Sequence, residues 1–137
     1  MTAYGRPDED WDAPMQAGSD FSCERAAMAR NTSYTEMSTT LARRAGVREF
    51  DFSQQAERAG MGYLLGRIGE DTYPTVDAML SAIVLYLDAN NAGPGFYALA
   101  GQMGLLERGA SKQDKERFWV DQVARVFRHF EGKSSRG

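Results

Sequence analysis

The most apolar part of the chain, residues 75–87, has to be buried, and this need constrains the fold more than any other sequence feature. Its apolar side chains recur at helical spacing and are Val76, Met79, Leu80, Ile83, Val84 and Leu87. Residues 83–87 also form a continuous β-favouring run that ends at a turn signal over 88–94. Periodicity does not separate a helix from a strand buried on both faces in so short a run. Residues 76–87 therefore fit either element, and we favour a strand over 80–87.

Helical periodicity is clearest in three other segments, which are 34–45, 96–104 and 112–130. The first has Ser33 or Thr35 available as its N-cap and Gly46 at the C′ position, where a left-handed residue belongs. At the start of the last segment, Ser111 and Asp114 approximate a capping box. The last segment also carries a wide apolar face, so we expect this helix to pack on the core.

Glycines interrupt the segment that precedes the apolar stretch. They stand at positions 60, 62, 66 and 69, and each costs about 1 kcal/mol inside a helix. We therefore predict a short helix over 53–59, stopped at Gly60, and a strand over 63–68. A further short helix is predicted over 21–30. The expected fold is a small, helix-rich α+β domain, in which a hydrophobic strand pair, 63–68 and 80–87, is covered by three to four helices.

The composition is that of one soluble globular domain. Of the 137 residues, 42 % are hydrophobic and 26 % are charged, close to the averages for such domains. The longest apolar run, 82–87, is far shorter than the roughly 20 residues of a membrane span, and no signal peptide is recognised. The single cysteine, Cys23, has no partner for an internal disulfide. We therefore expect a cytoplasmic protein.

The first residues differ from the rest of the chain in charge. The net charge is −3, and residues 1–20 hold five acidic side chains against one arginine. We divide the sequence into an irregular acidic arm, 1–18, one compact domain, 19–131, and a frayed end, 132–137. The near-neutral body lacks the basic balance of a dedicated nucleic-acid binder.

The acidic arm is the predicted partner-binding segment, with another protein as the expected partner. Its candidate residues are Asp8, Glu9, Asp10, Trp11 and Asp12. The carboxylates suit a basic partner, and an indole on a surface is a common interface anchor. The alternative is a solvated chain end. Further aromatic residues expected in exposed segments are Tyr4, Tyr34 and Tyr73.

The sequence contains no complete motif for catalysis, for a cofactor or for a metal. Cys23 and His129 are single and far apart, and neither a Cys-x-x-Cys nor a His-x-x-His pair occurs. We therefore expect no cofactor and no metal, and we favour a protein that is not an enzyme. The alternative is a small nuclease or toxin-like hydrolase with its site after the apolar stretch. Its candidate catalytic residues are Asp88, Asn91 and Tyr97.

Two glycines, Gly93 and Gly95, come just before the helix predicted over 96–104. This arrangement resembles part of a phosphate-binding loop, because free N–H groups at the start of a helix attract anions. The segment lacks the third glycine and the lysine of the nucleotide-binding fingerprints. We therefore favour a tight turn at this position.

A second alternative function rests on residues 41–58. The run from Leu41 to Val47, followed by Phe52, resembles the helix-turn-helix pattern of bacterial repressors. In that arrangement the residues that face DNA bases are Gln54, Gln55 and Arg58, since glutamine pairs with adenine and arginine with guanine. Against this reading, Gln55 falls where the recognition helix buries an aliphatic residue. A DNA-binding regulator therefore remains an alternative to a protein-binding role.

Four segments, made mostly of apolar residues and glycines, resemble a group of short, uncharacterised bacterial, plasmid and phage proteins. They are GYLLGRI at 62–68, LSAIV at 80–84, GPGFYxLA at 93–100 and Phe118-Trp119, and the similarity spans roughly residues 39–130. The resemblance implies a strand, turn and helix unit and a mobile-element setting, with no activity to carry over. The predicted function is a small binding, inhibitory or regulatory protein that acts through protein contacts, in the setting of phage–host or plasmid–host conflict.

Overall fold

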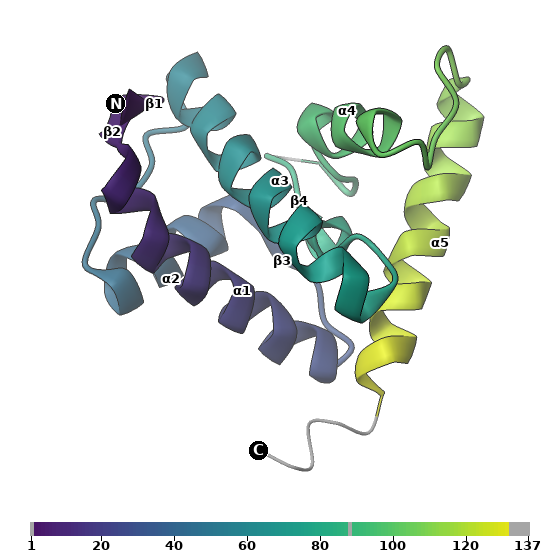
Figure 1. Ribbon diagram of the computed structural model, residues 1–137, viewed down its shortest axis with the longest axis horizontal. Coiled ribbons are helices and arrows are strands. Elements are labelled where there is room, and N and C mark those ends of the chain that lie inside the picture. The colour runs from purple at the N-terminus through teal and green to yellow at the C-terminus, as the bar shows by residue number, and fades with distance from the viewer. Residues whose placement is uncertain (1, 88, 132–137) are drawn as a thin grey trace.

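Long helices make up most of the fold (Figure 1), and the structure, a computed structural model, describes residues 2–87 and 89–131. The helices are α1 (Asp12–Ala27), α2 (Tyr34–Ala45), α3 (Gln55–Val76), α4 (Pro94–Gln102) and α5 (Lys112–Phe130). Two 3-10 helices are η1 (Asp8–Trp11) and η2 (Leu80–Ile83). The short strands are β1 (Thr2–Ala3), β2 (Arg6–Pro7), β3 (Thr32–Ser33) and β4 (Val84–Leu85). The predicted class, a small helix-rich α+β fold, is confirmed.

The apolar stretch is buried as expected, but most of it is not a strand. It forms η2 and then β4, so the single strand predicted over 80–87 is wrong. The backbone at and just before η2 is held by side chains of α5, and only β4 joins a sheet. The Trp119 indole N–H donates to the Ala82 carbonyl at 2.8 Å, and the Gln122 carboxamide oxygen accepts from the Met79 N–H at 2.8 Å. These bonds satisfy backbone groups that a sheet would otherwise pair.

Two small sheets form, and one of them joins distant parts of the chain. Strand β4 pairs in parallel with β3, with Thr32 opposite Val84 and Ser33 opposite Leu85. At the N-terminus, β1 and β2 form an antiparallel hairpin. The strand predicted over 63–68 takes part in neither sheet, because these residues lie inside α3.

Helix α3 runs through the glycines that were expected to interrupt it. Both the helix end at Gly60 and the strand over 63–68 are therefore wrong. One face of α3 is fully buried through Met61, Leu64 and Ile68. On another face the glycines allow close approach: a Cβ on Gly69 would lie 3.3 Å from the Ser81 hydroxyl. Packing on both faces offsets the low helix propensity of glycine.

The N-terminal segment is folded, which corrects the expectation of an irregular arm over 1–18. Helix α1 begins at Asp12 instead of near residue 21, so the proposed boundary between arm and domain falls inside a helix. Pro14 is accepted because it lies in the first turn, where its missing N–H has no partner to lose. Gly18 faces the core, where a Cβ would lie 3.0 Å from Ile68. The end predicted to fray, 132–137, lies outside the described residues.

The helices with clear local signals lie where they were predicted. Helix α2 begins with the Ser33 hydroxyl accepting the Glu36 N–H at 3.1 Å and ends at Gly46 in the left-handed region. Helix α5 begins with the Ser111 hydroxyl accepting the Asp114 N–H at 3.0 Å. In Figure 1, α1 and α2 lie on one side of α3, while α4 and α5 lie on the other.

Candidate functional site

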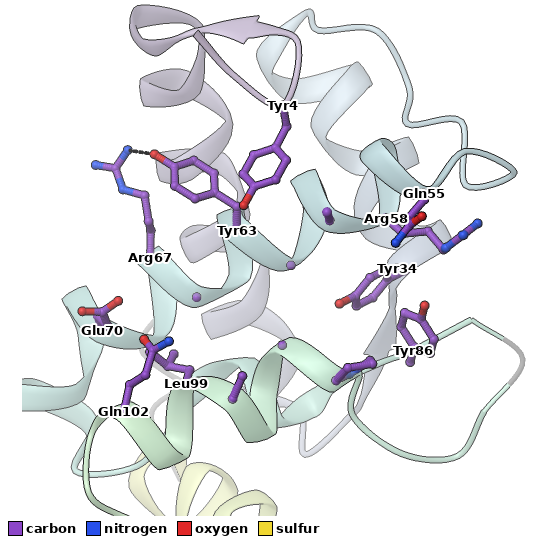
Figure 2. Close-up of a pocket in the computed structure, with 16 residues that line it drawn as sticks. Tyr4, Tyr34, Gln55, Arg58, Tyr63, Arg67, Glu70, Tyr86, Leu99 and Gln102 are labelled. Carbon is purple, nitrogen blue, oxygen red and sulfur yellow. Dashed lines mark hydrogen bonds between the residues drawn. The ribbon is translucent and has the colours of Figure 1, made fainter. Parts of the chain in front are cut away.

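A groove between α3 and α4 gathers aromatic and charged side chains (Figure 2). Its volume is about 690 Å³, within the usual range of ligand sites. The floor is made of glycine backbone from both helices: a Cβ on Gly95 would lie 3.8 Å from the Cα of Gly62. The backbones of the two helices therefore lie close together at the floor of the groove.

Tyrosine side chains line the groove in two pairs. Near one side, Tyr4 packs on Tyr63 with ring centroids 5.3 Å apart. At the end near the start of α4, the rings of Tyr34 and Tyr86 are 5.0 Å apart and nearly perpendicular. Tyrosine offers a large, rigid contact surface with a polar tip, and such residues are enriched at protein interfaces.

Tyr34 differs from the other groove tyrosines in its burial. Its side chain is only 3 % exposed, and this burial raises the pKa of its phenol to about 12. The hydroxyl therefore stays protonated at neutral pH and is a hydrogen-bond donor. Tyr4, by contrast, is 45 % exposed, as its predicted position in an exposed segment requires. The same prediction for Tyr34 is wrong, because α2 turns its ring into the core.

Two arginines stand on the rim of the groove. Arg58 donates to the Phe52 carbonyl at 2.7 Å, and Arg67 donates to the Tyr63 hydroxyl at 3.1 Å. The bond to Tyr63 raises the pKa of Arg67. Figure 2 shows Arg58 at the Tyr34 end, whereas Glu70 lies toward the opposite end. The rim is therefore positively charged at the Tyr34 end, whereas the opposite end carries one positive and one negative side chain, Arg67 and Glu70.

Two of the proposed catalytic residues, Asn91 and Tyr97, are hydrogen-bonded to each other, but their polar groups stabilise the loop before α4. The Asn91 carboxamide oxygen accepts hydrogen bonds from the Tyr97 hydroxyl and from the Ala92 N–H. The Asn91 carbonyl also accepts the Tyr86 N–H at 2.8 Å. This pair braces the loop against α4, and burial raises the pKa of Tyr97. The third candidate, Asp88, lies outside the described residues.

The proposed DNA-reading residues stand at the start of α3. The segment between α2 and α3, residues 46–54, is longer than the three- or four-residue turn of a helix-turn-helix motif. Residues 46–54 therefore do not form the turn that the helix-turn-helix alternative requires. Gln54 is turned back to Asp51, with its Nε2 donating to Oδ2 at 3.0 Å. Gln55 and Arg58 instead line the rim of the groove.

The acidic side chains predicted to bind a partner are exposed. They are Asp8, Glu9, Asp10 and Asp12, on η1 and the first residue of α1. Trp11 between them is fully buried against Tyr63, with ring centroids 5.0 Å apart. Its predicted role as an exposed anchor is therefore wrong, because the indole completes the core. The carboxylates remain a predicted contact surface.

Within residues 2–87 and 89–131, no cluster of three or more histidine, cysteine or acidic side chains has the geometry to hold a metal ion. None of the helices in the same part of the chain has the length and apolar content needed to span a membrane. Cys23 is half-buried, and this burial raises the pKa of its thiol.

Comparison with known proteins gave no match: no family, no curated protein and no solved structure resembles the chain closely enough to identify it. The resemblance to short phage and plasmid proteins therefore stays a prediction. The groove was not predicted as a site, although several of its residues were noted. The available signal was the spacing of Gly62 and Gly66, one helical turn apart, followed by Gly93-Pro94-Gly95.

Proposed function

We propose that this chain is a protein-binding protein that receives an extended segment of its partner in the groove between α3 and α4. The observation that carries the proposal is the groove itself, with its glycine floor and tyrosine walls. Rigid aromatic side chains around a narrow cleft are typical anchors for a peptide chain. The protein-binding role is the one predicted from the sequence, but the proposed binding site is the groove instead of the acidic segment.

The proposed ligand is an extended segment rather than a helix, because a thin chain reaches deepest toward the floor of the groove. Gly62 and Gly95 form this floor, where the two helix backbones come together. A helix with side chains is about 10–12 Å across, whereas a single extended chain is much thinner. An extended chain also presents alternate side chains to the two walls.

The test is peptide selection followed by blocking of the groove. Peptides selected from a random display library on the whole protein are measured against Ala59→Trp and against Ala56→Trp. Both alanines are exposed on the first turns of α3, but only Ala59 lines the groove. We expect Ala59→Trp to weaken binding by about tenfold or more, because the indole fills the cleft. Ala56→Trp is the matched control and should leave the affinity unchanged.

Two results would contradict the proposal. One is a selection that enriches no peptide above a control surface. The other is a set of selected peptides whose affinities fall equally in both tryptophan variants, since binding would then lie outside the groove.

A further inference from the structure

The Tyr34 hydroxyl points into the groove from a side chain that is only 3 % exposed (Figure 2). Its ring is clamped between Phe52 and Tyr86, with centroid distances of 5.7 and 5.0 Å. Among the residues that the structure describes, none forms a hydrogen bond with this hydroxyl. Because this hydroxyl opens on the groove and has no partner among those residues, it is available to an acceptor atom of a bound ligand.

The same end of the groove holds the start of α4. Helix α4 has Gly93 as its N-cap, with no side chain to cap it, and Pro94 in its first turn. The Phe96 N–H donates to the Gly93 carbonyl at 3.1 Å, while the Gly95 N–H has no acceptor within the helix. The positive end of the helix dipole therefore faces this part of the groove.

The Tyr34 hydroxyl lies where a capping side chain would otherwise be. A Cβ on Gly93 would be 2.9 Å from this hydroxyl and 2.8 Å from the Tyr86 ring. The glycine thus leaves the start of α4 open and places the phenol beside it. Arg58 lies on the rim at the same end of the groove and adds a full positive charge there, with its guanidinium donating to the Phe52 carbonyl at 2.7 Å and directed away from the Tyr34 hydroxyl (Figure 2).

We infer that this end of the groove is a subsite for one carboxylate of the bound peptide, held by the Tyr34 hydroxyl and the Gly95 N–H, with the positive charge of Arg58 on the same end of the rim. The peptide as ligand rests on the proposed function, whereas the preference for an anion rests on these donors alone. One guanidinium balances the single charge of an aspartate or glutamate side chain. Glu70, the acidic residue on the groove, lies toward the far end and does not oppose the anion.

The test measures the subsite without the partner. Acetyl-Ala-Asp-Ala-amide and its uncharged counterpart acetyl-Ala-Asn-Ala-amide are titrated into the ¹⁵N-labelled protein, and the Gly95 amide is followed by NMR. We expect a saturable shift with the aspartate peptide and a much smaller one with the asparagine peptide. Tyr34→Phe should weaken the aspartate peptide about tenfold, the usual effect of losing one hydrogen bond to a charged group. Tyr73→Phe, on α3 outside the groove, is the matched control and should change nothing.

Equal Gly95 shifts with the two peptides, or an unchanged affinity in Tyr34→Phe, would overturn the subsite. A response to inorganic phosphate at far lower concentration than to the aspartate peptide would overturn it in favour of a phosphate group. The results also distinguish failure of the subsite from failure of the proposed function. If Ala59→Trp weakens the display-selected peptides but Tyr34→Phe does not, the groove still binds peptides and the subsite is refuted. If the Gly95 amide shifts with the aspartate peptide but the display library yields no binding peptide, the anion site stands and the peptide-binding function is refuted.

Discussion

Glycines of this protein differ in how close an added methyl group would lie to neighbouring side chains. This distance determines whether alanine at that position would stabilise or destabilise the fold. At Gly66 an added Cβ would find its nearest neighbour, a methyl of Leu99, at 4.0 Å. At Gly93 it would lie 2.8 Å from the Tyr86 ring and 2.9 Å from the Tyr34 hydroxyl, although the backbone there suits any residue. The first glycine is thus replaceable, and the second is required by its neighbours.

These two positions give opposite predictions for the same substitution. Gly66→Ala should raise the free energy of unfolding by about 0.5–1 kcal/mol, the gain in helix propensity. Gly93→Ala should lower it by about 1–3 kcal/mol, because two aromatic rings have to move. Urea denaturation of the two variants beside the unmodified protein measures both changes. Equal destabilisation by the two alanines would contradict the assigned packing.

Tyr34 also predicts how stability changes in alkaline solution. Burial raises the pKa of its phenol from about 10 in the unfolded chain to about 12 in the folded protein. Its contribution is therefore complete below about pH 10 and is lost as the pH rises toward 12. Over that range Tyr34→Phe should lose roughly 2 kcal/mol less stability than the unmodified protein. Unfolding free energies at pH 9 and 11.5 test this, and parallel losses in both proteins would refute it.

At the scale of elements, α5 holds the apolar stretch through side-chain bonds to backbone. The Trp119 indole and the Gln122 carboxamide each pair with a backbone group of the segment around η2, at 2.8 Å. Gln122 is buried, so the Met79 N–H that it satisfies has no access to water as a substitute. The contact between α5 and η2 is therefore specific as well as apolar.

Replacing Gln122 by methionine keeps the side-chain length and removes the acceptor. We expect Gln122→Met to lower the free energy of unfolding by about 1–3 kcal/mol, because the buried Met79 N–H is left unpaired. Gln113→Met, at an exposed position in the first turn of α5, is the control and should change stability by less than about 0.5 kcal/mol. Thermal unfolding followed by circular dichroism distinguishes them. A loss no larger than that of the control would show that the bond does not hold α5 to η2.

At the scale of the whole molecule, the N-terminal segment completes the core. Trp11 is fully buried, and the Arg6 guanidinium lies over the Phe50 ring with 4.0 Å between its carbon and the ring centroid. Burial lowers the pKa of Arg6, and its charge lies 4.0 Å from the carboxylate of Glu57, a buried residue of α3. Glu57 also accepts hydrogen bonds from Arg48 and from the Asp51 N–H. The hairpin is thereby tied to α3 and to the segment before it.

Removal of residues 1–11 should therefore impair folding as a whole. Loss of a buried aromatic side chain alone costs about 3–5 kcal/mol, a large part of the stability of a small domain. We expect the truncated chain to lose cooperative thermal unfolding. Asp8→Asn and Glu9→Gln together form the control, because these two side chains are exposed. Cooperative unfolding of the truncated chain at an unchanged temperature would contradict the role of Trp11.

Several residues of the candidate site carry a signal in the sequence, but most of these signals point to another role. The sequence predicts an exposed Tyr34, a DNA-reading role for Gln55 and Arg58, and a tight turn at Gly95, whereas Tyr4 is exposed as predicted. The residues come from the N-terminal hairpin, α2, α3 and α4, and no local pattern says that these elements meet. Tyr63 was assigned to a strand, which would have turned its side chain in a different direction from its place on α3.

The sequence by itself determined the helices whose evidence is local. Helices α2 and α5 have an apolar face and a serine cap, and both signals act within a few residues of the chain. Only the tertiary structure decided α3, η2, β4 and the groove. The glycine penalty in α3, about 1 kcal/mol per residue, is offset by contacts with residues far along the chain, such as Ser81 and Leu99. Burial of the apolar stretch follows from its composition, whereas its conformation depends on the side chains of α5 that pair with its backbone.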